Sequence, residues 1–164
     1  MVILVTSDTH GKRDRLSALT ERVCPDLVFF LGDGVRDLDA LPDGLSVRAV
    51  RGNCDFFGSA DLPERRVEEV GGLRFFLTHG HRYGVKYSLE SAICAAVGAG
   101  ADALLYGHTH IPFEKTLTAG STVGGVMLEK PLLVVCPGSL GDADASFATL
   151  TLRGGVMLAG FGKL

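Results

Sequence analysis

Residues 1–11, MVILVTSDTHG, show a pattern that recurs along the whole chain. Residues 2–5 form a short, β-branched apolar run, which predicts a buried strand. The run changes within five residues to the polar side chains of Asp8 and His10. Four later apolar runs end in the same way. Their polar segments hold Asp33, then Asn53 and Asp55, then His79 and His81, and finally His108 and His110.

Strands and helices alternate in the first part of the sequence, and strands dominate the last part. Apolar spacing predicts helices over 13–23, 35–41 and 87–97. Strands are predicted over 2–5, 27–31, 47–50, 66–70, 73–77, 103–106, 123–128, 132–136, 147–152 and 156–161. Gly71-Gly72 separates two of these strands and predicts a hairpin. This order favours an α/β fold in which two mixed sheets pack together.

The composition limits the classes of protein that fit. The 164 residues, 46% of them hydrophobic, suit one domain over 1–164 that needs no disulfides. A net charge of −3 argues against a general nucleic-acid binder. No apolar run reaches the roughly 18–20 residues of a membrane span, and the N-terminus does not resemble a signal peptide, so we expect a cytoplasmic protein. The four cysteines form no Cys-x-x-Cys pair, so no zinc ribbon is expected.

The polar strand ends predict a metal centre. Ligands of open α/β sheets bind at the carboxyl ends of the strands, and all five histidines of the chain follow strands in this way. Carboxylate, amide and imidazole groups suit Mn²⁺, Fe²⁺, Zn²⁺ or Ni²⁺. Seven such groups exceed the needs of one ion, whereas two ions with a bridging carboxylate would use them all.

Five motifs in a fixed order connect the chain to a known family. They are Asp8-x-His10, Gly32-Asp33, Gly52-Asn53-x-Asp55, His79-Gly80-His81 and Gly107-His108-Thr109-His110. In this order they resemble the motifs of the calcineurin-like metallophosphoesterases. Residues 78–86, THGHRYGVK, and the segment Pro137-Gly138-Ser139 are similar to the small bacterial and archaeal phosphodiesterase branch of that family.

The resemblance implies a four-layer α/β/β/α sandwich and a role for each motif residue. One metal ion would be bound by Asp8, His10 and His110, and the other by Asn53, His79 and His108. Asp33 would bridge the two ions, and a metal-bridging hydroxide would attack the phosphorus. The resemblance also implies catalytic roles for Asn53, Cys54, Asp55 and His81. Asp55 would lie behind the ligands, and His81 would lie near the substrate.

Two positions depart from the family pattern. Many members have a histidine between the Asn and the Asp of the third motif, where this chain has Cys54. With a reference pKa near 8.5, a thiol protonates a leaving group less well than an imidazolium does. This suggests hydrolysis of phosphodiesters, with weak activity on monoesters. The second departure is Cys136, where the branch commonly has asparagine; it concerns a loop contact and no ligand.

Simpler roles remain open for several residues taken singly. Asp33 could cap a helix, Asn53 could be a left-handed turn residue, and Asp55 could cap a turn or orient a ligand histidine. Cys54 could be a small buried thiol, and we do not interpret it as a nucleophile. Four basic residues could steer a phosphate or be solvated loop charges: Lys12, Arg13, Arg82 and Lys86. Phe56 and Phe57 are expected in the core, with base stacking or an interface as the alternative.

The leading hypothesis is a hydrolase that uses two divalent ions, first of all Mn²⁺, to cleave small phosphodiesters. One alternative is a phosphomonoesterase or nucleotide pyrophosphatase that uses the same residues. Another is a protein-interaction scaffold that resembles the eukaryotic retromer subunit of this fold; loss of metal ligands would favour it, but no expected ligand is missing here. A homo-oligomer is compatible with the apolar C-terminal hairpins. We expect neither membrane binding nor general nucleic-acid binding.

Overall fold

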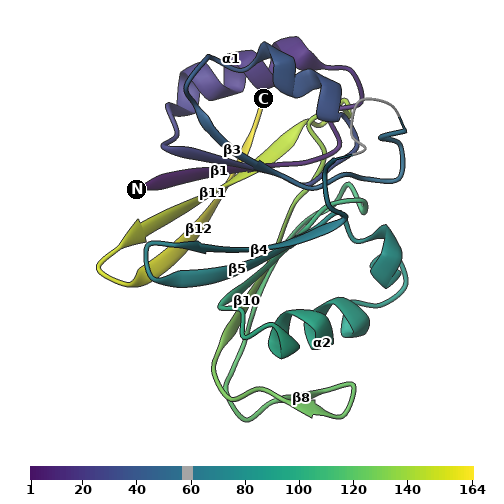
Figure 1. Cartoon of the computed structure of the whole chain (residues 1–164), viewed down its shortest axis with the longest axis vertical. Helices are drawn as coiled ribbons and strands as arrows, with labels where there is room; N and C mark the ends of the chain where they lie inside the picture. The colour runs from purple at the N-terminus through teal and green to yellow at the C-terminus, as the bar shows by residue number, and fades with distance from the viewer. Residues whose placement is uncertain (57–60) are drawn as a thin grey trace.

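Two five-stranded sheets lie face to face at the centre of the molecule, with helices on both outer sides (Figure 1). The computed structural model describes residues 1–56 and 61–164. α1 (Arg13–Val23) and the 3₁₀ helix η1 (Val35–Ala40) cover the first sheet. α2 (Glu90–Gly98) covers the second sheet, and the 3₁₀ helix η2 (His81–Tyr83) precedes it. The expected α/β/β/α order of layers is therefore confirmed.

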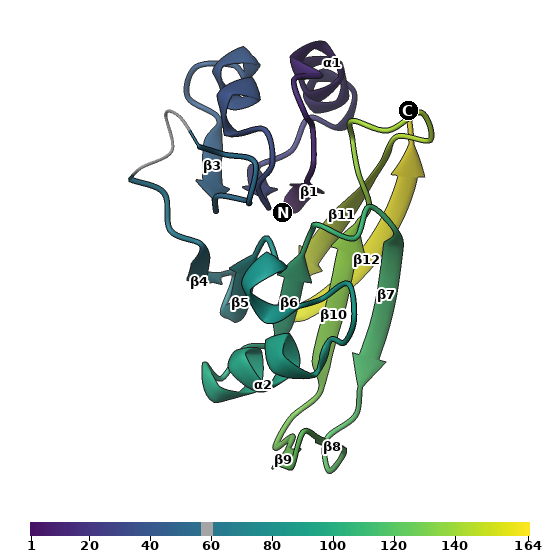
Figure 2. The same ribbon diagram turned by 90° about the vertical axis from the view of Figure 1, so that its right-hand side faces the viewer.

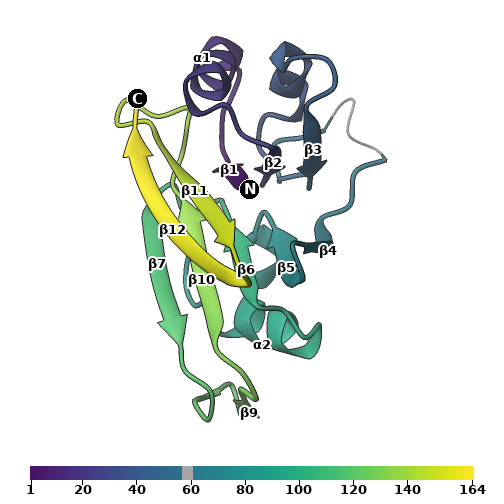
Figure 3. The ribbon, with the colours of Figure 1, turned by 90° about the vertical axis from the view of Figure 1, so that its left-hand side faces the viewer.

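The first sheet has the strand order β12-β11-β1-β2-β3 (Figure 3). Its central strands β1, β2 and β3 are parallel, whereas β11 runs antiparallel to both β1 and β12. The strands are β1 (Val2–Thr6), β2 (Leu27–Phe30), β3 (Ser46–Ala49), β11 (Ser146–Arg153) and β12 (Val156–Lys163). Because β1, β2 and β3 are parallel, the polar segments that follow them leave the sheet at one edge.

The second sheet has the strand order β4-β5-β6-β10-β7 (Figure 2). Here β5, β6 and β10 are parallel, and the antiparallel strands β4 and β7 form the edges. The strands are β4 (Arg65–Val70), β5 (Leu73–Thr78), β6 (Ala103–Tyr106), β7 (Pro112–Leu117) and β10 (Leu132–Pro137). A small hairpin of β8 (Thr122–Val123) and β9 (Val126–Met127) projects beyond this sheet.

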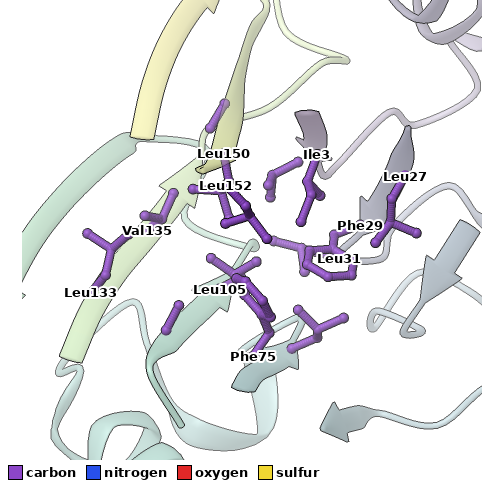
Figure 4. Packing of buried hydrophobic residues seen from close by; sticks show 14 of the residues in the cluster. Ile3, Leu27, Phe29, Leu31, Phe75, Leu105, Leu133, Val135, Leu150 and Leu152 are labelled. Carbon is purple, nitrogen blue, oxygen red and sulfur yellow. The ribbon is translucent and has the colours of Figure 1, made fainter. Parts of the chain in front are cut away.

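Three layers of apolar side chains hold the sandwich together. The layer between the two sheets contains the tilted pair Phe29 and Phe75, whose ring centroids lie 5.3 Å apart (Figure 4). A second layer joins α1 and η1 to the first sheet, and a third joins α2 to the second sheet. Because β1, β2, β6 and the part of β5 from Phe75 onward pack on both faces, their sequences are continuous apolar runs rather than alternating ones.

Several sequence-based predictions need correction. The short helix expected over 35–41 is present as a 3₁₀ helix, Val35–Ala40, whereas the helix expected over 87–97 begins only at Glu90. The strand predicted over 123–128 is a short hairpin. β7 was not predicted because its sequence, PFEKTL, is polar, as suits an exposed edge strand. Phe56 is 80% exposed rather than in the core, and Phe57 lies outside the described residues.

None of the helices in the described ranges is long and apolar enough to cross a membrane.

Candidate metal centre

The polar segments meet at one end of the sandwich, where the carboxyl ends of the parallel strands of both sheets come together. Asp8 and His10 follow β1, Asp33 follows β2, His79 follows β5 and His108 follows β6. The structure places ligand atoms within 4.8 Å of one another in three groups: Asp8, His10 and His110; His10, Asp33 and Cys54; and Asp33, His79 and His108. Both sheets therefore contribute side chains to one centre.

One half of the centre has the spacing of a metal-binding site. Nε2 of His79 lies 3.2 Å from Oδ1 of Asn53, 3.2 Å from Nδ1 of His108 and 3.3 Å from Oδ2 of Asp33. Two ligands of one ion, with bonds of about 2.0–2.1 Å, lie roughly 3.0–3.4 Å apart. The four side chains therefore fit around a single divalent ion.

Hydrogen bonding orients His79 toward this position. Its Nδ1 donates to the carbonyl oxygen of Leu31 at 2.7 Å, which leaves the lone pair of Nε2 directed into the centre. Burial lowers the pKa of His79, but the hydrogen bond to Asp33 and the charges of Asp8 and Asp33 raise it overall. The negative charges around the His79 ring therefore favour a positive charge at this position.

His108 is held in the neutral form that can bind a metal ion. Burial, together with the neighbouring His79, lowers the pKa of His108 to about 4. The imidazole is therefore neutral at pH 7, which is the state that binds metal ions. Its backbone N–H donates to Oδ2 of Asp8 at 3.0 Å and so fixes the loop after β6 against the loop after β1.

The other half of the centre is built around Asp8. The side chain of Asp8 is completely buried, and its Oδ2 accepts hydrogen bonds from Ser7 and His108. Its Oδ1 has no hydrogen-bond partner in the described part of the chain, and it lies 3.2 Å from Nε2 of His110 and 3.8 Å from Nε2 of His10. Burial raises the pKa of Asp8. A buried carboxylate oxygen beside two imidazoles fits a bound cation.

Asp33 lies between the two halves. It belongs both to the group with His79 and His108 and to the group with His10. Its Oδ1 accepts the N–H of Cys54 at 2.7 Å. Although burial raises the pKa of Asp33, the hydrogen bond and charge of His79 and the Cys54 hydrogen bond lower it well below its ordinary value. Asp33 is therefore an ionised carboxylate within reach of both groups.

The candidate ligands occupy an uncommon backbone conformation. Positive φ angles between 46° and 69° occur at Asp8, His10, Asp33, His108 and His110. Such angles strain a residue that carries a Cβ and are concentrated at functional sites. The surrounding loops maintain these angles.

Close backbone contact explains two glycines beside the ligands. A Cβ on Gly52 would lie 2.6 Å from the nitrogen of Asp33, and one on Gly107 would lie 3.0 Å from Oδ2 of Asp8. A side chain at either position would displace a ligand loop.

Asp55 holds the loops rather than facing the ligand atoms. Its carboxylate accepts the backbone N–H groups of Asp33, Gly34, Val35 and Gly52 at 2.8–2.9 Å. These hydrogen bonds join the loop after β2 to the loop after β3. Asp55 therefore supports the positions of Asp33 and, through the same loop, Asn53.

Cys54 and His81 both border the centre. The exposed Cys54 is next to Asp33, and desolvation of the thiol together with that carboxylate raises its pKa to about 11. The ring of His81 has its centroid 5.5 Å from that of His79 and 6.2 Å from that of His108. Its Nδ1 is buried and has no partner in residues 1–56 and 61–164. Burial and the charge of His79 lower the pKa of His81.

Sequence reasoning missed Asp142. Its Oδ2 lies 2.9 Å from Nδ1 of His110, so it holds the imidazole whose Nε2 faces Asp8. Arg15 donates to the carbonyl oxygen of Asp142, and the N–H of Asp142 contacts the hydroxyl of Ser139 at 3.3 Å. Asp142 is 32 residues from His110 and follows no predicted strand directly, so no motif or periodicity marked it.

An open cleft of about 340 Å³ adjoins the centre. Its walls come from the segments that follow β1, β2 and β3, including the starts of α1 and η1. They consist of His10, Gly11, Arg13, Asp33, Gly34, Arg36, Asp37, Cys54, Asp55 and Phe56. The candidate ligands are therefore accessible to a small molecule from this side.

Comparison with known proteins identifies the family. The sequence model of the calcineurin-like phosphoesterase superfamily domain matches residues 1–155. The chain belongs to this superfamily. A relative from Bacillus subtilis, the probable metallophosphoesterase YsnB, is 31% identical over 158 residues, which cover 93% of this chain and 85% of YsnB. A probable metallophosphoesterase from Mycoplasma pneumoniae is 32% identical, and the alignment covers 79% of this chain and 80% of that protein.

Solved structures agree with this assignment. A predicted phosphoesterase from Streptococcus pneumoniae TIGR4 superposes on this chain with a TM-score of 0.74 at 27% identity. The superposition covers 99% of this chain and 88% of the Streptococcus protein. Vps29 of Entamoeba histolytica, solved in complex with Zn²⁺, superposes with a TM-score of 0.65 at 22% identity over 99% of both chains, which shows a shared fold. The family and the candidate ligand groups together make this chain a metal-dependent phosphoesterase.

Proposed function

We propose that this phosphoesterase uses two divalent metal ions to hydrolyse the phosphodiester bonds of small substrates. The observation that carries the proposal is that the candidate ligand groups overlap. Asp33 groups with His79 and His108 and also with His10, and His10 in turn groups with Asp8 and His110. Asn53, His79 and His108 would hold one ion, and Asp8, His10 and His110 the other. Two such ions, when bound, supply an activated water and neutralise the phosphate oxygens.

The donor set favours borderline divalent ions. Four imidazoles, two carboxylates and one amide oxygen suit Mn²⁺, Fe²⁺, Ni²⁺ and Zn²⁺ better than they suit Ca²⁺ or Mg²⁺, which prefer oxygen ligands. We propose Mn²⁺ as the ion to test first. The chemistry of the ligands alone accepts the other three.

The remaining residues orient the substrate and limit the reaction. His81 lies beside His79 and His108, where a phosphate oxygen on that ion would meet its ring. Cys54 occupies the position at which many family members have a histidine, and a thiol protonates a leaving group poorly at neutral pH. The preferred substrate therefore has a leaving group that departs without a proton from the protein. A diester with an acidic alcohol fits this requirement better than an alkyl monoester.

A paired assay tests the proposal. The protein is stripped of metal, reloaded with Mn²⁺ and given bis(p-nitrophenyl) phosphate or p-nitrophenyl phosphate. Both release the same leaving group, so the comparison reports which phosphate the centre prefers. We expect metal-dependent cleavage with higher kcat/KM for the diester. A preference for the monoester would contradict the diesterase proposal. No cleavage with any of the four ions would instead favour a scaffold role, as in the alternative set out above.

A further inference from the structure

The outer edge of β12 is long, regular and almost without charge. β12 ends the first sheet, with β11 on one side and no strand on the other within residues 1–56 and 61–164 (Figure 3). It pairs with β11 over all eight of its residues in one unbroken register, from Val156 to Lys163. The unpaired N–H and C=O groups along such an edge are a template on which another strand can pair.

The other three edges of the two five-stranded sheets, in the part of the chain that the structure describes, are protected against such pairing. β3 has only four residues. β4, RRVEEV, has four charged residues among six, and its Glu68 forms an ion pair with Arg48 of β3. β7 begins with proline and carries the exposed Glu114 and Lys115. Short strands, charges and proline prevent edge-to-edge pairing, and β12 has none of them over 156–162, VMLAGFG.

Apolar side chains are exposed along this edge. Val156, Leu158 and Phe161 are 57%, 65% and 42% exposed. Val156 and Leu158 lie on the outer face of the sheet, whereas Met157 and Ala159 pack against the apolar layer between the sheets. A second strand beside β12 would therefore cover apolar side chains on both faces of the sheet.

The hydrogen-bonding pattern determines which backbone groups point outward. In an antiparallel pair, alternate residues bond to the neighbouring strand, and the residues between them point their N–H and C=O groups away from it. Leu164 continues the register of β12 and donates its N–H to the carbonyl oxygen of Ala145. The even-numbered residues of β12 therefore bond to β11. Met157, Ala159 and Phe161 point their backbone groups toward the outer edge, where no strand in the described residues pairs with them.

A second copy of β12 fits this edge because the strand is complementary to itself. If two copies pair antiparallel about Ala159, Met157 lies opposite Phe161 of the second copy, and the outward groups of these residues form about six hydrogen bonds. Leu158 then lies opposite Gly160 of the second copy, where no side chain obstructs it. The two Lys163 side chains stand at opposite ends of the contact, roughly 27 Å apart along the strands, so like charges do not meet.

We propose that two copies of this protein pair through β12 and join their first sheets into one continuous sheet. The contact has a two-fold axis at Ala159 and uses the same surface of both copies, so it closes at a dimer. Because β12 contributes no residue to the candidate ligand groups, this inference is independent of the proposed function.

Sedimentation equilibrium of the unmodified protein, from about 1 to about 100 µM, tests the proposal. We expect a species of twice the chain mass of 17.3 kDa. L158K should weaken dimerisation by about tenfold or more, because it removes an apolar contact from each copy and places two like charges roughly 7–8 Å apart on one face of the joined sheet. V67K is the matched control, since it makes a comparable change at an exposed position of the edge strand β4 and should leave dimerisation unchanged.

Cross-linking tests the register of the pair. A159C places the two new thiols opposite each other, with their Cα atoms about 5.5 Å apart, which a disulfide can span. With oxidised glutathione, A159C should give a covalent dimer on a denaturing gel. The unmodified protein, in which Cys24 and Cys54 are exposed, sets the background.

Three results would overturn the proposal. The first is a monomer at every concentration of the unmodified protein, which would leave the edge to another partner or to none. The second is a dimer that L158K and V67K weaken equally or that neither weakens. The third is a yield of covalent dimer in A159C that does not exceed the background, and this result decides the matter if L158K does not fold.

Discussion

Asp142→Asn tests whether the carboxylate behind His110 contributes to metal binding. The substitution keeps an oxygen that can accept the hydrogen bond of Nδ1 but removes the negative charge. Asp142 lies 2.9 Å from Nδ1 of His110, and its side chain is 47% exposed. The imidazole should therefore become a weaker electron donor toward an ion held by Nε2.

The size of the effect follows from this geometry. Loss of a carboxylate that orients a ligand histidine typically costs about 10–100-fold in metal affinity. Water already screens half of this side chain, so we expect the lower end of that range. The predicted change is about tenfold in the dissociation constant, or about 1.4 kcal/mol.

Competition against a fluorescent chelator measures the affinity and the number of bound ions together. We expect two equivalents of Mn²⁺ in the unmodified protein. In Asp142→Asn one of them should bind about tenfold more weakly and the other should be unchanged. Asp144→Asn is the matched control, because it removes the same charge from an exposed side chain two residues along the same loop.

Two results would refute this reasoning. If both equivalents keep their affinity, His110 either does not bind metal or does not depend on Asp142. If both equivalents weaken equally in Asp142→Asn and in Asp144→Asn, the effect is a general loss of negative charge rather than the orientation of one imidazole.

Three further predictions concern the centre itself. Asp33→Ala should reduce phosphoesterase activity by more than the roughly 100-fold that loss of an indirect partner costs, and elemental analysis should show less bound metal. Gly52→Ala should lower the free energy of unfolding, measured in urea, by about 1–3 kcal/mol, because the Cβ of the new alanine would displace Asp33. The control Gly98→Ala lies in an open position of α2 and should raise the free energy of unfolding by roughly 0.5–1 kcal/mol. Because the pKa of Cys54 is raised to about 11, only about one Cys54 thiol in a thousand is ionised at pH 8. Iodoacetamide should therefore modify Cys54 slowly in metal-free protein, with a rate that rises about tenfold per pH unit up to that pKa. Rapid modification of Cys54 at pH 8 would contradict this prediction.

The sequence was informative about the centre because its chemistry follows strand ends. Each apolar run of β1, β2, β5 and β6 is buried on both faces, so it contrasts sharply with the polar segment after it. The parallel strands then bring those segments to one edge. Fold class and candidate ligands could be predicted because both depend on this contrast.

Other features depend on contacts that leave no local signal. β7 is polar because it lies at an exposed edge, and the pairing of β11 with β1 joins segments about 150 residues apart. Asp142 reaches His110 only because Arg15 and Ser139 hold its loop. Phe56 was expected in the core from its hydrophobicity, but its position on a loop beside a cleft leaves it exposed.

The division of the ligands between the two sheets has a consequence for folding. Asp8, His10 and Asp33 come from the first sheet, and His79 and His108 from the second. An ion held by both sets is a cross-link between the two halves of the sandwich, added to the apolar layer that joins them. An ion that binds only to the folded state adds about 2.7 kcal/mol to the free energy of unfolding when its free concentration is one hundred times its dissociation constant. Chelation would then cost this protein resistance to heat as well as activity, and its melting temperature would report the supply of metal.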